Sequence, residues 1–164
     1  SGLKMTGSPD RPEAHTLRGA TDRAALLRIH DIVETMEPLA TAELDDYLNP
    51  SVLELTLEDG LCEAKTARID VQWTTQGEYK FHYTDDQGVD FRWGKHPHGG
   101  DYIHVPRLEH YHPPPDASSE PDEVEASCIT QAPPDLVIRA VLKLWRVAYH
   151  TNSYEPLNAG QNPP

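Results

Sequence analysis

The chain has 164 residues, 37% of them hydrophobic, which suits one domain with a modest core. Its 27 acidic and 14 basic residues give a net charge of −13, which excludes the basic patch that most nucleic-acid-binding proteins use for affinity. No run of about 20 apolar residues is present, which excludes a membrane-spanning helix, and two isolated cysteines favour reduced thiols in a cytoplasmic protein.

The first segment predicts a polar arm followed by a helix. Residues 1–18 are expected to be a disordered arm, and its first four residues, which precede Met5, carry no part of the prediction. Thr21 and Asp22 can cap a helix that ends before Pro38, because the residue before a proline disfavours helix. Its apolar residues recur at helical spacing: Leu26, Leu27, Ile29, Ile32, Val33 and Met36. A short helical turn is predicted at residues 42–47.

From Ser51 the apolar pattern changes to a period of two, which is typical of strands. Strands are predicted at residues 52–57, 67–74, 78–84 and 89–93, joined by turns that contain Gly60, Gly77 and Gly88. Two further short strands are expected at residues 102–105 and 124–130.

A second helix is predicted near the C-terminus. Pro133 and Pro134 mark its start, since proline is tolerated in the first helical turn, and an apolar face runs from Leu136 to Ala148. The element order predicts an α+β fold: an antiparallel β-meander of about four to six strands, with an N-terminal and a C-terminal helix packed on one face. We expect one domain over residues 19–150, with a histidine-rich loop at 94–115 and a disordered tail at 151–164.

The segment from Glu78 to Pro114 concentrates the chemistry of the chain. It holds six of the nine histidines, interleaved with aromatic residues: His82, His96, His98, His104, His110 and His112. Histidine is the side chain whose ordinary pKa lies between about 5 and 8, so such a cluster indicates proton transfer, metal binding or polar recognition.

The order of motifs in this region resembles that of the TumE-type toxins of prokaryotic type II toxin–antitoxin modules. The resemblance covers residues 52–113 and extends toward the C-terminal helix. It implies a growth-inhibiting toxin that acts as a nuclease and is neutralised by a cognate antitoxin. The motifs are Leu57-Glu58-Asp59-Gly60, Tyr79-Lys80-Phe81-His82-Tyr83, Asp85-Asp86-Gln87-Gly88, Phe91-Arg92-Trp93, Lys95-His96-Pro97-His98 and Pro106-Arg107-Leu108-Glu109-His110-Tyr111-His112.

The residues themselves suggest a ribonuclease that needs no metal or other cofactor. Two histidines can act as base on the ribose 2′-OH and as acid on the leaving 5′-oxygen, while an arginine neutralises the transition state. The predicted acid–base pair is His98 and His110, with His96 and His112 as alternates. The predicted substrate contacts are Arg92 or Arg107 for phosphate and Tyr83 or Trp93 for base stacking.

Two other functions fit the same segment. The pairs His96-x-His98 and His110-x-His112, with His104 or Asp101, could bind zinc. Alternatively, the aromatic, histidine-rich surface is a non-catalytic module that binds a protein partner. No P-loop, GxGxxG or GxSxG motif is present, which argues against an NTPase, a dinucleotide-binding protein or a serine hydrolase. The oligomeric state stays open, a homodimer included.

The acidic composition does not exclude RNA as a substrate. Abundant Asp and Glu with few lysines are typical of a salt-adapted, haloarchaeal type of surface. At about 1 M salt the Debye length falls to about 3 Å, so charge repulsion between the protein and RNA is largely screened.

Overall fold

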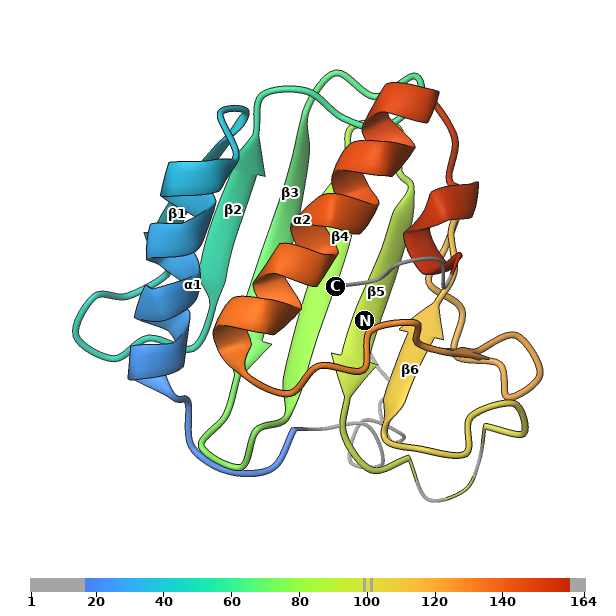
Figure 1. The fold of residues 1–164 in the computed structure, drawn as a ribbon, viewed down its shortest axis with the longest axis horizontal. Coiled ribbons are helices and arrows are strands. Elements are labelled where there is room, and N and C mark those ends of the chain that lie inside the picture. The colour runs from blue at the N-terminus through green and yellow to red at the C-terminus, as the bar shows by residue number, and fades with distance from the viewer. Residues whose placement is uncertain (1–16, 99, 101, 160–164) are drawn as a thin grey trace, which may run out of the picture.

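The structure, a computed structural model, describes residues 17–98, 100 and 102–159. It contains one antiparallel sheet of seven strands and two α-helices (Figure 1). The predicted α+β class with an N-terminal and a C-terminal helix on the sheet is confirmed, with more strands than the four to six expected. The elements are α1 (Arg23–Met36), β1 (Ala40–Leu44), β2 (Leu53–Leu57), β3 (Ala67–Trp73), β4 (Tyr79–Asp85), β5 (Asp90–Lys95), β6 (Glu109–His112), β7 (Glu125–Ala126), α2 (Pro134–Thr151) and the 3₁₀ helix η2 (Glu155–Asn158).

The sheet is a simple meander in which each strand pairs with the next strand of the chain. Because side chains alternate between the two faces of a strand, the pairing register extends each face across the sheet. Leu55, Ile69, Tyr83 and Phe91 are successive cross-strand partners, and all four are buried. This apolar face is the one that the helices cover.

Helix α1 begins where the sequence predicts. The Asp22 carboxylate accepts a hydrogen bond from the Ala25 backbone N–H (3.0 Å), and the helix ends at Glu37, before Pro38. Helix α2 begins at Pro134 and ends at Thr151, and the capping residue Asn152 has a left-handed conformation with φ of 56°. Both helices lie on the same side of the sheet (Figure 1).

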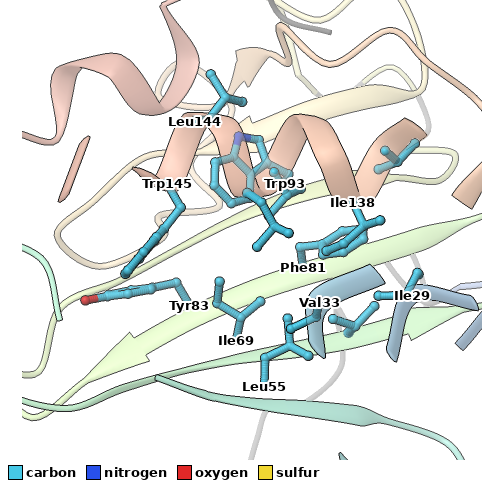
Figure 2. Close-up of a cluster of buried hydrophobic side chains, with 14 of the residues drawn as sticks. Ile29, Val33, Leu55, Ile69, Phe81, Tyr83, Trp93, Ile138, Leu144 and Trp145 are labelled. Atoms are coloured by element: carbon cyan, nitrogen blue, oxygen red, sulfur yellow. The ribbon is translucent and has the colours of Figure 1, made fainter. Parts of the chain in front are cut away.

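The core lies between this helical layer and the sheet. Figure 2 shows Trp145 and Ile138 of α2 and Ile29 of α1 facing Phe81 and the other side chains of the sheet. All four of these side chains are buried. Aromatic rings make up much of what the sheet contributes to this core. Neighbouring rings are in contact, as with Tyr83 and Phe91, whose ring centroids are 4.5 Å apart.

Three local predictions were wrong. Residues 40–44 form strand β1, where a helical turn was expected at 42–47, because pairing with β2 outweighs the helix propensity of Ala, Glu and Leu. Asp45 closes that hairpin by accepting hydrogen bonds from the backbone N–H groups of Ser51 and Val52. Residues 102–105 contain turns instead of a strand, and the strand expected at 124–130 is limited to β7.

The packed domain extends beyond its predicted end at residue 150. Leu157 in η2 is buried, and its carbonyl oxygen accepts a hydrogen bond from the Trp93 indole N–H (3.0 Å). The described part of the predicted tail, residues 151–159, is thus part of the fold, and residues 160–164 lie outside the described residues.

The predicted arm, residues 1–18, falls almost entirely outside the described residues. Its last residue, Arg18, is fixed by the buried Glu78, whose carboxylate accepts hydrogen bonds from the Arg18 backbone N–H and Nε (2.7 Å each). Within the range that the structure describes, no helix combines the length and the apolar content that crossing a membrane requires.

Candidate nucleic-acid interface

The face of the sheet opposite the helices carries a row of polar side chains. Asp70, His82, Arg92 and His112 are successive cross-strand partners from β3 to β6. We call these four residues the polar row. Directly opposite residues in antiparallel strands have Cβ atoms about 5 Å apart, so these side chains are near neighbours. The two described α-helices lie on the other side of the sheet, so neither covers the row.

His82 is the member of the row that combines a titratable ring with exposure to solvent. Its side chain is 36% exposed, although its Nε2 is buried and lies 3.8 Å from Asp90 Oδ1. Partial burial lowers its pKa below the ordinary value, and the positive charge of Arg92 adds to this effect, while Asp90 and Asp70 oppose it. His82 is therefore mainly neutral at pH 7 and can accept a proton.

Arg92 is a half-buried positive charge that its neighbours hold in place. Its Nη2 lies 3.3 Å from His112 Nε2 and 3.4 Å from Ser119 Oγ. Its Nε is buried and has no hydrogen-bond partner among the described residues. Burial lowers the pKa of Arg92, but arginine stays charged at any pH at which a protein is folded. Arg92 is only partly buried, and a charged guanidinium is a good donor to phosphate oxygens.

His112 orients this guanidinium. Arginine can only donate, so His112 Nε2 must accept the hydrogen bond from Arg92. Its other nitrogen, Nδ1, lies 2.8 Å from the Ser118 carbonyl oxygen, which can only accept. His112 is thus the neutral Nδ1–H tautomer, and it connects Arg92 to the loop after β6.

The structure brings the four histidines predicted to be catalytic into one cluster. The rings of His96, His98 and His112 lie 4.5, 6.0 and 5.1 Å from the ring of His110, and Tyr102 packs over them. All four imidazoles are buried. The cluster lies on the same side of the sheet as the polar row and shares His112 with it.

Backbone carbonyls bind one nitrogen of each of these rings. His96 Nδ1, His98 Nε2 and His110 Nδ1 lie 2.8–3.0 Å from the oxygens of Pro97, Arg107 and Leu108, respectively. His98 Nδ1 and His110 Nε2 are buried without a hydrogen-bond partner among the described residues. The cluster is therefore a small polar core that joins the loop after β5 to the sheet.

His110 stays neutral near pH 7. Burial, followed by the nearby His96 and His112, lowers the pKa of His110 to about 2. The ring lies against Gly94, where a Cβ atom would come within 3.0 Å of His110 Nε2. A ring that does not become an imidazolium near pH 7 is a poor general acid.

The residues predicted to bind substrate are separated by the fold. We call the face of the sheet opposite the helices the open face. Arg92 lies on it, but Tyr83 and Trp93 are fully buried and point toward the helices (Figure 2), so neither ring has a face exposed to a base. Arg107 lies in the loop before β6, is 54% exposed, and is 4.0 Å from Glu109. Sequence reasoning missed His82 as a site residue, although its alternation with Phe81 and Tyr83 already placed it on the opposite face from those rings.

The structure gives no support to the predicted zinc shell. Among the described residues, no three His, Cys, Asp or Glu side chains are arranged so as to hold a metal ion. His104 is exposed and lines a hollow with Asp122 and Glu123, whereas the four histidines of the two predicted pairs are buried. Asp101, the other predicted ligand, lies outside the described residues.

A comparison with protein families places the chain among known sequences. The family model described as Toxin TumE matches residues 28–147, which run from α1 through every strand of the sheet and most of α2. No curated protein and no solved structure matches the chain significantly.

Proposed function

Since the chain belongs to the TumE toxin family, we propose that it acts on RNA through the polar row on the open face of its sheet. The observation that carries this proposal is the position of Arg92 between His82 and His112. A charged phosphate-binding group thus lies beside a neutral, solvent-accessible imidazole. The family also implies a cognate antitoxin as the partner, and an RNA-directed toxin would act in the cytoplasm.

Arg92 supports binding of the phosphodiester. Arginine donates to phosphate oxygens through a planar fork, and these charge-assisted bonds are about twice as strong as neutral ones. Among the described residues, Arg92 forms no ion pair with a carboxylate, although Asp90 is near enough to act on its charge. In a protein of net charge −13, affinity for RNA has to come from local contacts of this kind.

His82 supports a transphosphorylation that needs no metal. Its neutral ring accepts the proton of the ribose 2′-OH while the 2′-oxygen attacks phosphorus. The bond from phosphorus to the 5′-oxygen breaks, water supplies the proton for that oxygen, and the products are a 2′,3′-cyclic phosphate and a 5′-OH. Arg92 stabilises the additional negative charge of the transition state.

The pair His98 and His110 is a second candidate for acid–base catalysis. Two ring nitrogens without hydrogen-bond partners among the described residues favour it, His98 Nδ1 and His110 Nε2, and the two rings are 6.0 Å apart. Burial of both rings counts against direct contact with a substrate. We therefore rank this pair, with its alternates His96 and His112, below His82.

Replacing His82 or Arg92 by glutamine tests the proposal. We expect each variant to cleave labelled RNA about 100-fold more slowly, since general acid–base groups contribute 10²–10⁴-fold. The assay is run at about 2 M KCl, where charge repulsion is screened. His30→Gln is the matched control, because His30 is similarly exposed but lies on α1, on the far side of the sheet.

Each other outcome has a definite meaning. Cleavage that survives His82→Gln but is lost in His98→Ala and His110→Ala would move the catalytic role to the buried pair. Binding of RNA that needs Arg92, without cleavage by the wild type, would make the toxin a non-catalytic binder. Growth inhibition that persists in Arg92→Gln, with an unchanged melting curve, would reject the open face as the site.

The pH dependence of cleavage gives an independent check. A general base must be deprotonated, and the pKa of His82 lies below the ordinary 6.5. The acid limb of kcat/KM should therefore have its midpoint below pH 6.5 and should be absent in His82→Gln. A midpoint above pH 6.5 would contradict the assignment.

A further inference from the structure

A hollow of about 390 Å³ lies beside the C-terminal part of α2, next to the end of α1. We call it the helix groove. It is on the helical side of the sheet, so the sheet separates it from the polar row. It is lined by Met36, Arg139, Leu142, Lys143, Arg146, Val147, His150 and Thr151.

The helix groove exposes apolar side chains that the fold does not use. Met36 is 41% exposed and Val147 is 43% exposed, and they lie on different helices on either side of the hollow. Apolar side chains that line a shared hollow on a protein surface often mark an interaction site, whereas single exposed ones are ordinary.

The charge of the groove is opposite to that of the chain. Three of its eight lining residues are Arg139, Lys143 and Arg146, and none is acidic. Residues 136–154 contain no Asp or Glu, although acidic residues outnumber basic ones by 27 to 14 in the chain. Arg146 forms an ion pair with the buried Glu37 (2.7 Å), which fixes that end of the groove.

We infer that the helix groove binds an amphipathic, acidic helical segment of the cognate antitoxin. Apolar anchors of the segment would lie between Met36 and Val147, and flanking Asp or Glu would pair with Arg139 and Lys143, as in other helix-in-groove complexes. The inference rests on the antitoxin that the family implies and is independent of whether the toxin cuts RNA.

Other occupants fit the groove less well. A second copy of the chain would bring Arg139 and Lys143 close to their own symmetry mates, and like charges repel. An RNA strand would place its charged phosphates against the apolar side chains of Met36, Leu142 and Val147, which offer them no hydrogen-bond donor. An amphipathic, acidic protein segment matches both the apolar side chains and the positive charge of the groove.

Two kinds of variant test this site with the purified cognate antitoxin as the probe. Val147→Asp places a charge on the apolar wall, and the double variant Arg139→Glu/Lys143→Glu reverses the charge of the rim at two exposed positions. Titration calorimetry should give at least tenfold weaker antitoxin binding for each, while RNA cleavage and melting temperature stay at wild-type values. Leu27→Asp on α1, with 37% exposure, is the matched control for Val147→Asp and should bind normally.

The result also separates this inference from the RNA proposal. The inference would be overturned if both groove variants bound the antitoxin within twofold of the wild-type affinity. It would also be overturned if the groove variants lost RNA binding but still bound the antitoxin normally. Open-face variants such as Arg92→Gln should keep full antitoxin affinity. If the open-face variants cleaved RNA at the wild-type rate while the groove variants lost antitoxin affinity, the RNA site would be rejected and the inference about the helix groove would be kept.

Discussion

Truncating Trp93 to alanine is expected to lower the free energy of unfolding by about 3–5 kcal/mol, the cost of removing a large buried aromatic side chain. The indole is fully buried, and its ring lies 5.3 Å from Phe91 and 5.9 Å from Tyr111 between centroids. Its N–H also donates to the carbonyl oxygen of Leu157, so the truncation releases η2 from the sheet.

Urea unfolding at constant KCl measures the effect. Trp93→Phe should cost less than Trp93→Ala, because it keeps most of the apolar contact and loses only the N–H donor. Leu48→Ala is the control, because Leu48 is 86% exposed and its truncation should change stability by less than about 0.5 kcal/mol. A loss below about 1 kcal/mol for Trp93→Ala would contradict the packing described above.

Acid should destabilise the protein through its buried histidines. The folded-state pKa of His110 is about 2, whereas an unfolded histidine titrates near 6.5. The unfolded chain therefore binds a proton below pH 6.5 that the folded chain does not. The stabilising contribution is complete above pH 6.5 and falls by about 1.4 kcal/mol for each pH unit below it, or about 3 kcal/mol at pH 4.

A difference between variants isolates this contribution from that of the many carboxylates. Wild type and His110→Leu are compared by urea unfolding between pH 7 and pH 4, and their difference in stability should shift with pH in favour of the variant. Leu48→Ala removes no titratable group and should have the pH dependence of the wild type. If the stability difference between the wild type and His110→Leu did not change with pH, His110 would be protonated as easily in the folded state as in the unfolded one.

Much of the fold could be predicted because its signals are local. The alternation of Tyr79, Phe81 and Tyr83 with Lys80 and His82 marks a strand with one buried face, and the structure has that face against the helices. The Asp22 cap and the prolines at the start of α2 predicted both helices correctly. Strand β1 could not be predicted in this way, since its residues favour helix and only pairing with β2 makes them extended.

The site was harder to predict, because residue type says little about what covers a side chain. Tyr83 and Trp93 suit base stacking by chemistry, but their strand parity directs them into the core. His98 and His110 suit proton transfer, but carbonyls of the loop before β6 bind them, and those contacts depend on how that loop folds back. For His82, alternation along β4 predicts the face on which it lies, but its position beside Arg92 depends on the register of two strands, which the sequence of β4 alone does not contain.

The meander has a consequence for how the toxin is made. Every strand pairs with the one synthesised just before it, so the sheet can assemble step by step as the chain leaves the ribosome. The apolar face of that sheet is closed by Trp145 and Leu157, which belong to the last elements to be translated. A nascent chain thus carries the polar row before it has a sealed core, and the helix groove is completed only with α2. Toxicity and neutralisation should therefore both begin at the end of synthesis, within the same stretch of about 20 residues that forms α2 and its flank.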